Sequence, residues 1–176
     1  MFIRIKKVSG KTYAYLVQNV WTSAGTRQKA KGYLGRVYVC NPVLIDAVDF
    51  SCLQPDKNRQ KQAIELVIEI FLEKLGFVKE KASWKLSIEK KIITYSGKKL
   101  FCAKKPVVLQ VGEGYFCTYT IQKLFSLSSD LEKIEQSRQR AKLLALRFVN
   151  AGIQLDAPVF IQLYKFISQN DSGDEQ

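Results

Sequence analysis

The stretch of sequence that decides the fold is residues 1–40, which read MFIRIKKVSGKTYAYLVQNVWTSAGTRQKAKGYLGRVYVC. Aromatic and β-branched side chains are frequent in residues 2–8 and 12–20, and Ser9-Gly10-Lys11 between them is typical of a hairpin turn. A second turn at Thr22-Ser23-Ala24-Gly25 leads into a third extended run. We therefore expect three short antiparallel strands here.

The rest of the chain is predicted to contain a helix, further strands and then more helices. Asp56 to Leu75 has a helical period with a wide apolar face, and Gly76 follows as a stop signal. The strands expected next are 84–88, 91–95, 100–103 and 107–111. The helices expected after them are 118–126, one that opens at the capping-box pattern Ser129-Asp130-Leu131-Glu132 and ends at Gly152, and a last one from Asp156.

This order of elements predicts an α+β fold: an N-terminal three-stranded antiparallel sheet, a helix, a second small β region and a C-terminal helical segment. The 176 residues, 47% hydrophobic and 25% charged, fit one globular domain with a small appended module. We divide the chain into a basic β-sheet module at 1–40, an α+β body at 41–169 that ends in helices, and a disordered acidic tail at 170–176.

The charge is strongly and unevenly positive. Lys plus Arg number 28 against 16 Asp plus Glu, a net charge of +12 with no histidine. Residues 1–40 hold 8 basic and no acidic side chains, and residues 77–127 hold 10 and 3, whereas 41–76 hold 4 and 6. We therefore expect a basic face rather than uniform basicity, and a polyanionic partner, DNA or RNA.

The candidate interface lies in the first 40 residues, where cations and aromatic residues interleave. Side chains two apart on a strand share a face, so Arg27, Lys29 and Lys31 are expected to project together, as are Arg4 and Lys6. Such a face displaces counterions from phosphates, fits the major groove of DNA, or stacks on unpaired bases. The candidate nucleic-acid-binding residues are Arg4, Lys6, Lys11, Tyr13, Tyr15, Trp21, Arg27, Lys29, Lys31 and Arg36.

A second basic block is made of lysine alone. Lysine is a mobile point charge that discriminates little between bases, so this block would add affinity rather than sequence selectivity. A solvated, lysine-rich sheet surface explains it equally well. Its members are Lys79, Lys81, Lys85, Lys90, Lys91, Lys98, Lys99, Lys104 and Lys105.

The opening segment resembles the amino-terminal segment of DDE-class insertion-sequence transposases. The matching positions are Phe2, Arg4, Gly10, Lys11, Tyr13, Tyr15, Arg27, Gln28, Lys29, Tyr33, Leu34 and Gly35. The resemblance covers about the first fifth of the chain and implies a sheet that contacts DNA. The catalytic domain with its metal-binding acids has no counterpart here, so transposition is not implied.

The whole chain also resembles a group of small uncharacterised archaeal proteins. They share this opening and three later segments, here Glu113-Gly114-Tyr115, Tyr119-Thr120 and Ala151-Gly152. This second resemblance implies no particular activity.

Several classes of site are excluded by composition. The four cysteines lie at least 12 positions apart and the chain has no histidine, so no CxxC knuckle, Cys/His zinc site or histidine-dependent nucleophile can form. We therefore expect no metal and no cofactor. No leader pattern and no apolar run of 18 residues is present, which favours a cytoplasmic protein without membrane contact, with reduced and mostly buried thiols.

Two alternatives remain beside nucleic-acid binding without catalysis. Pro55-Asp56 and Glu89-Lys90-Lys91 match a metal-dependent nuclease pattern, although capping of a helix explains Asp56 equally well. The C-terminal helices could instead contact a protein partner or a second copy of the chain. We favour a non-enzymatic nucleic-acid-binding protein, with DNA ahead of RNA.

Overall fold

The structure is a computed structural model that describes residues 1–23, 25–53 and 58–168. Its strands are β1 Phe2–Val8, β2 Lys11–Thr22, β3 Gly25–Cys40, β4 Leu44–Ile45, β5 Val78–Glu80, β6 Ser83–Ile88, β7 Lys91–Ser96, β8 Lys99–Cys102, β9 Lys105–Val111, β10 Gly114–Cys117 and β11 Gln154–Leu155. Its helices are α1 Arg59–Lys74, α2 Thr118–Phe125, α3 Leu127–Leu131, α4 Ser137–Asn150 and α5 Ala157–Ser168.

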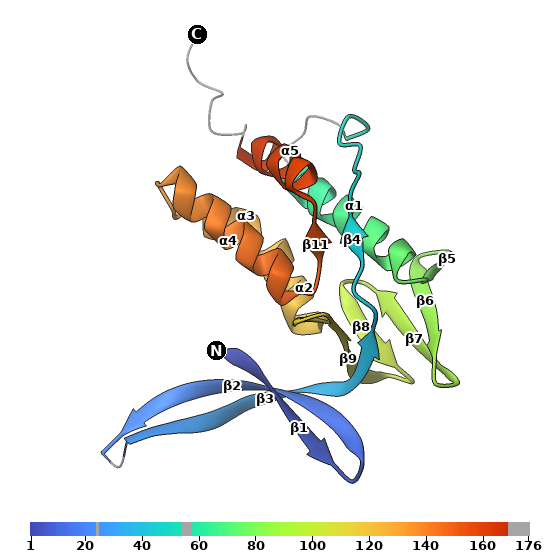
Figure 1. Cartoon of the computed structure of the whole chain (residues 1–176), viewed down its shortest axis with the longest axis vertical. Coiled ribbons are helices and arrows are strands. Elements are labelled where there is room, and N and C mark those ends of the chain that lie inside the picture. The colour runs from blue at the N-terminus through green and yellow to red at the C-terminus, as the bar shows by residue number, and fades with distance from the viewer. Residues whose placement is uncertain (24, 54–57, 169–176) are drawn as a thin grey trace.

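Nine of the described strands form one large sheet. Its order is β1-β2-β3-β9-β8-β7-β6-β5, and β10 pairs with β9 beside β8. The prediction of a three-stranded N-terminal sheet and a second small β region is therefore wrong. The three strands expected over residues 1–39 form in the expected antiparallel order, but β3 continues the sheet into β9. The helices gather on one side of this sheet, and the end of the β2–β3 hairpin projects from it (Figure 1).

The junction between β3 and β9 explains why two β regions merge. Strand β3 pairs with β2 along one edge as far as Arg36, and with β9 along its other edge from Arg36 to Cys40. This last stretch contains the buried Val37 and Tyr38, and it pairs in parallel with the apolar strand β9. Parallel strands need a long connection between them, so no turn pattern in the sequence predicts that β3 and β9 pair.

A glycine permits the close approach of these two strands. Gly35 has a φ of +133°, which side-chain-bearing residues rarely adopt. A Cβ atom there would lie 2.3 Å from the carbonyl oxygen of Pro106 on β9. The backbone of β3 therefore crosses that of β9 at a position where any other residue would collide with it.

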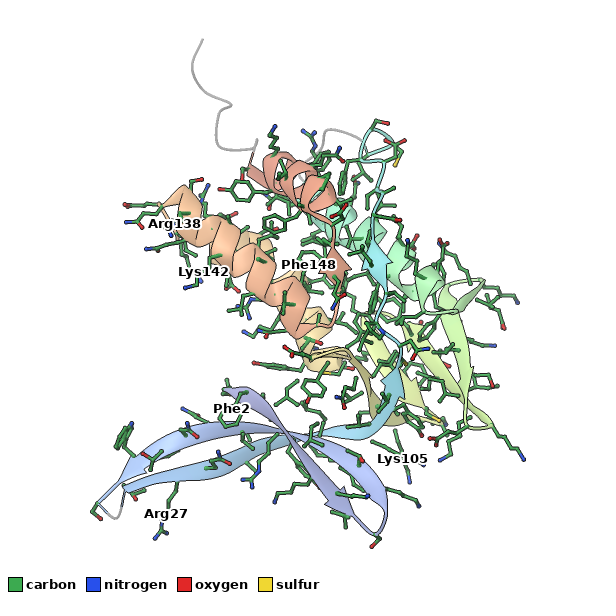
Figure 2. All side chains as sticks on the ribbon, viewed as in Figure 1. Phe2, Arg27, Lys105, Arg138, Lys142 and Phe148 are labelled. Carbon is green, nitrogen blue, oxygen red and sulfur yellow. The ribbon has the colours of Figure 1, made fainter. Side chains whose placement is uncertain are left out.

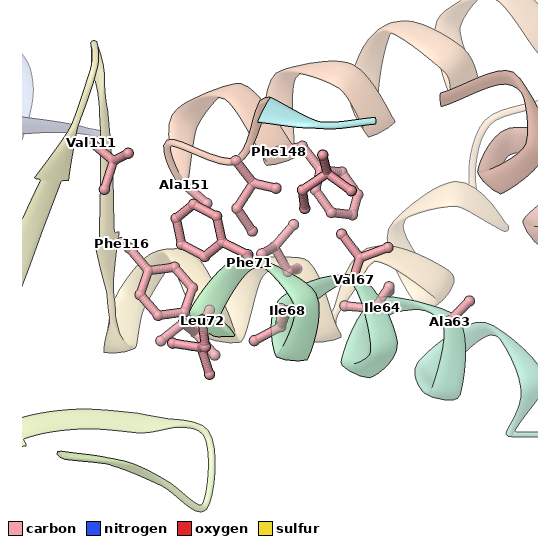
Figure 3. Packing of buried hydrophobic residues seen from close by; sticks show 14 of the residues in the cluster. Ala63, Ile64, Val67, Ile68, Phe71, Leu72, Val111, Phe116, Phe148 and Ala151 are labelled. Carbon is pink, nitrogen blue, oxygen red and sulfur yellow. The ribbon is translucent and has the colours of Figure 1, made fainter. Parts of the chain in front are cut away.

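The main core lies between the sheet and the helices. Helix α1 contributes the apolar face that its period predicts, with Ile64, Val67 and Phe71 fully buried. Phe116 of β10 packs against Phe71, with ring centroids 5.1 Å apart (Figure 3). The start of the helix expected from Asp56 lies outside the described residues.

The helical C-terminal segment differs from the prediction in one respect. A long helix opening at Ser129 does not form, because α3 ends at Leu131 and α4 begins at Ser137. Leu131 and Leu144 are both buried in the main core. In one continuous helix these two residues, thirteen positions apart, would lie about 140° apart around the helix axis and could not face the same core. The chain therefore reverses between them. The helices expected near 118–126 and from Asp156 are confirmed as α2 and α5.

Within the described ranges, no helix combines the length and the apolar character needed to cross a lipid bilayer.

Candidate nucleic-acid interface

A two-stranded ribbon projects from the edge of the sheet. Strand β1 pairs with β2 only as far as Val17, and from Gln18 to Thr22 the only pairing partner of β2 is β3. All described side chains of β3 from Gly25 to Tyr33 are exposed. We call residues 18–29 the ribbon (Figure 1). It carries three of the predicted site residues: Trp21, Arg27 and Lys29.

The predicted site residues divide between the two faces of the sheet. Residues paired across antiparallel strands share a face, and the register pairs Arg4 with Tyr15, Lys6 with Tyr13, and Tyr13 with Arg36. We call this side, which also carries Tyr33, the tyrosine face. Arg27 pairs with Val20 and Lys29 with Gln18. Val20 and Gln18 are even-numbered positions of β2, whereas Tyr13 and Tyr15 are odd-numbered, so Arg27 and Lys29 lie on the opposite face of the sheet from the tyrosines.

Lys31 does not keep this alternation. The register passes from Val17 paired with Ala30 to Leu16 paired with Gly32, which leaves Lys31 in a bulge. The expectation that Arg27, Lys29 and Lys31 project as one row is therefore wrong at Lys31, because a bulge inserts one residue into the strand and ends the two-residue period.

The tyrosine face is held together by its aromatic rings. Tyr33 lies 6.2 Å from Tyr13 and 5.6 Å from Tyr15, measured between ring centroids. The ammonium of Lys6 lies 5.8 Å from the ring of Tyr15. Partial burial, and then the neighbouring tyrosines, raise the pKa of the Tyr33 phenol above its ordinary value.

Arg4 and Trp21 extend the tyrosine face toward the end of the ribbon. Arg4 donates a hydrogen bond from its guanidinium to the Gln28 amide oxygen, and Trp21 is 83% exposed. A tryptophan with so little packing is free to stack on a ligand.

A groove opens beside the tyrosine face where three hairpin turns meet. The turns are Ser9-Gly10 between β1 and β2, Glu89-Lys90 between β6 and β7, and Ala103-Lys104 between β8 and β9. The groove has a volume of about 960 Å³. Its cationic lining residues are Lys11, Arg36, Lys90, Lys91, Lys104 and Lys105, and its aromatic lining residues are Tyr13, Tyr33, Tyr38 and Phe101. We call it the cationic groove.

No carboxylate belongs to the lining of the cationic groove among the described residues. Arg36 makes an ion pair at its edge, 2.8 Å from Glu89, while its guanidinium also lies 4.8 Å from the ring of Tyr38. In the part of the chain that the structure covers, the five lysines of the groove have no acidic side chain within 4 Å. Their charge is therefore available to an external anion.

Two of these turns, Glu89-Lys90 and Ala103-Lys104, have backbone strain at both positions. Glu89, Lys90, Ala103 and Lys104 all have φ between +47° and +66°. Two-residue hairpin turns with positive φ at both positions favour Asn and Gly, and another residue there costs about 1 kcal/mol. The chain nevertheless places lysine in the second position of both turns, and such strain is common at functional sites.

Seven members of the lysine-only block fall into two groups, and Lys81 and Lys99 belong to neither. On the side of α1, Lys79 lies 3.0 Å from Glu69, and Lys98 lies 3.7 Å from Glu65. Lys85 pairs with Glu80. These lysines are engaged by the protein's own acids, whereas Lys90, Lys91, Lys104 and Lys105 line the cationic groove. In sequence the groove lysines are recognisable as Lys-Lys pairs at predicted turns, but their proximity to residues 11–38 is not.

The groove also includes aromatic residues that the sequence did not single out: Tyr33, Tyr38 and Phe101. Phe2 is exposed near the start of the sheet.

In Figure 2 the side chains of Arg27 and Lys105 both point away from the helices. In this view one cation of the ribbon and one of the groove therefore point to the same side of the molecule, although Arg27 lies on the opposite face of its own strand pair from the tyrosines.

Among the described residues no group of three or more Cys, Asp or Glu side chains is placed to hold the metal ion that the nuclease pattern needs. Asp56 of that pattern lies outside the described residues, and the Glu89 carboxylate pairs with Arg36. The expectation of mostly buried cysteines is wrong: Cys117 is buried, Cys40 and Cys102 are partly buried, and Cys52 is exposed. Burial raises the pKa of the Cys117 thiol.

The C-terminal helices carry a separate apolar surface. A groove of about 480 Å³ lies between α4, α5 and β11, with Phe148 and Phe160 in its wall. Leu146, Val149 and Ile161 are exposed on the same helices.

Comparison of the chain with protein-family models, with curated proteins and with solved structures finds no match.

Proposed function

We propose that this protein binds nucleic acid without catalysis, with DNA favoured over RNA. One observation carries the proposal: cations from turns that are far apart in the sequence meet in the cationic groove, and no acid lines it among the described residues. Convergence of like charges is unfavourable unless an anion compensates for it. Aromatic rings beside these charges are typical of surfaces that bind a sugar–phosphate chain and its bases.

The ribbon supports duplex DNA as the form that is bound. The major groove of B-DNA admits a two-stranded ribbon, whereas that of an RNA helix is too narrow for side chains to read. Arg27 and Lys29 alternate along β3 on one face of the ribbon, two residues apart. They would contact phosphates or guanine edges, and the groove lysines would hold the backbone beside the ribbon.

The test is a titration of the full chain against duplex DNA, single-stranded DNA and structured RNA at two salt concentrations. Lys91→Ala/Lys105→Ala removes two groove cations on strands, where alanine fits the backbone. We expect weaker binding to DNA and a log–log salt dependence that is flatter by up to about 2, since each phosphate contact contributes about 0.9.

Lys79→Ala/Lys85→Ala is the matched control, because both lysines lie on strands and are engaged by glutamates outside the groove. It should leave the salt dependence unchanged. Equal effects of the two double variants would mean that net charge, and not the groove, drives binding. Absence of salt-dependent binding to any of the three nucleic acids would refute the proposed function.

The apolar surface of α4 and α5 favours a second role as a protein contact, either with a partner or with another copy of the chain. Exposed Val149 and Ile161 would be covered in such a contact. Sedimentation of the chain over a range of concentrations tests self-association, and Val149→Glu should reduce it. We place both roles in the cytoplasm, where the free thiols would stay reduced.

A further inference from the structure

An apolar pocket adjoins the cationic groove. Its volume is about 580 Å³, within the range of small-molecule sites of about 300–1,000 Å³. Tyr33, Phe101, Tyr119 and Leu34 supply most of its wall, and Pro106 closes one side. It lies where β3, the β8–β9 hairpin and α2 come together.

The pocket and the groove are continuous. Four residues line both of them: Tyr33, Phe101, Lys104 and Pro106. The ring of Tyr33 is 50% exposed at this boundary. A strand whose phosphates lie in the groove would therefore pass directly over the mouth of the pocket.

Polar groups are few in the pocket: Thr118 and Gln122 lie on α2, and Lys99 and Lys104 come from the β8–β9 hairpin. The Thr118 hydroxyl accepts a hydrogen bond from the Leu100 amide at 3.2 Å, which leaves its own proton to donate. The Gln122 amide is exposed and makes no side-chain hydrogen bond within the described ranges. A flat aromatic ligand with donors and acceptors on its edge matches apolar walls that carry a few polar groups.

We propose that this pocket holds an unpaired nucleobase of the DNA strand that lies in the cationic groove. The inference rests on the proposed function and names its substrate class: DNA that has an unpaired stretch next to a duplex. The ribbon contacts the duplex, the groove holds the phosphates of the strand that continues from it, and one base of that strand stacks between Tyr33 and Phe101. Gln122 and Thr118 contact the edge of this base.

The experiment compares a blunt duplex with the same duplex carrying a single-stranded tail, at one salt concentration and with the full chain. We expect the tailed DNA to bind about tenfold more tightly, because stacking of one base on an aromatic side chain contributes roughly that much. A fluorescent 2-aminopurine in the tail should be quenched on binding. The same base analogue within the duplex should not respond.

Two variants assign the effect to the pocket. Phe101→Leu should remove most of the preference for the tailed DNA and leave the affinity for the blunt duplex within about twofold of the original. Gln122→Ala, an exposed helical position that tolerates alanine, should change the relative affinity for different tail bases. Phe160→Leu and Gln162→Ala are the matched controls, because they alter a partly buried phenylalanine and an exposed glutamine on α5.

Each outcome is decisive. Equal affinity for tailed and blunt DNA, with salt-dependent binding retained, overturns this inference and leaves the proposed function standing. A tail preference that Phe101→Leu and Gln122→Ala both leave intact also overturns it, since the tail would then be held elsewhere. No salt-dependent binding to either DNA overturns the proposed function and this inference together, and tight binding to RNA alone overturns the choice of DNA.

Discussion

Four lysines among the described residues occupy backbone positions at which glycine would be less strained: Lys81, Lys90, Lys98 and Lys104. Lys90 and Lys104 have φ of +60° and +66° in turns that open onto the cationic groove. A structural turn would gain stability from glycine at these positions. Retention of a long cationic side chain there is understandable if the ammonium group serves the ligand and not the fold.

Lys104→Gly is therefore expected to separate stability from binding. The free energy of unfolding should stay the same or rise by up to about 1 kcal/mol, because glycine adopts this conformation without strain. Affinity for DNA should fall about threefold, as one phosphate contact is lost. Denaturant unfolding and a DNA titration on the same preparation measure the two effects.

Lys81→Gly is the control for this change. Lys81 also has a positive φ, +53°, and is exposed, but it does not line the groove. It should gain the same stability without any loss of affinity. A loss of stability in Lys104→Gly would assign that lysine a structural role and contradict this interpretation.

At the level of single residues, the sequence predicted the types of side chain better than their grouping. Arg4, Lys6, Tyr13, Tyr15 and Arg36 come together on the tyrosine face because strand alternation is a local rule. Alternation failed at Lys31, where a bulge intervenes. The approach of the groove lysines to this face depends on contacts between distant strands, which no local pattern encodes.

Among the elements, the ribbon is the one that can be removed without disturbing the core. Replacing residues 18–29 by Asn-Gly would join Val17 to Ala30, which are already paired, through a favoured two-residue turn. The removed part of β3 is fully exposed. We expect an unchanged melting temperature, weaker binding to duplex DNA, and a salt dependence flatter by about 2 through loss of Arg27 and Lys29.

The shortened chain should still prefer tailed over blunt DNA, since the groove and the pocket remain. Calorimetry checks the melting temperature and titrations check the two affinities. Unchanged binding to duplex DNA would show that the ribbon takes no part in the interface.

Elements with strong local signals were predicted well. Strands β6 to β9 and helices α1, α2 and α5 follow the expected hydrophobic periods, within the described ranges. The break between α3 and α4 was missed, because Ser129 to Glu132 carries a helix-opening pattern and no glycine or proline marks the reversal. The reversal is set by packing of Leu131 and Leu144, and it brings Arg147 to 2.9 Å from Asp130.

At the scale of the whole molecule, stability should fall at alkaline pH through a buried tyrosine. Burial, and then the charges of Glu65 and Glu69, raise the pKa of Tyr95 to about 12. Its ordinary pKa is about 10. Between these two values the unfolded chain loses the proton and the folded chain keeps it, so the folded state loses up to about 1.4 kcal/mol per pH unit.

Tyr95→Phe should remove this part of the pH dependence. Unfolding by urea at pH 8 and pH 11 should give a smaller loss of stability for the variant than for the original chain. Tyr33 remains in both proteins and contributes equally to each. An identical loss in the two chains would mean that Tyr95 ionises as freely in the folded state as in the unfolded one.

The overall architecture was the feature that could be predicted least well from the sequence. The class of secondary structure was predicted, yet the joining of both β regions into one sheet was not. It depends on five parallel pairs between Arg36–Cys40 and Val107–Val111. A contact between segments so far apart has no signature in periodicity or turn composition, and only the complementarity of their apolar side chains favours it.

The parallel junction also has a consequence for biosynthesis. During translation β3 is complete at Cys40, but its neighbour begins only at Lys105. Until that segment has left the ribosome, the nascent chain presents an open strand edge with the apolar Val37 and Val39, a surface prone to association with other chains. The acid-free cluster of positive charges around this edge would make emerging copies repel one another, so the residues that we propose bind a polyanion would also limit association during synthesis.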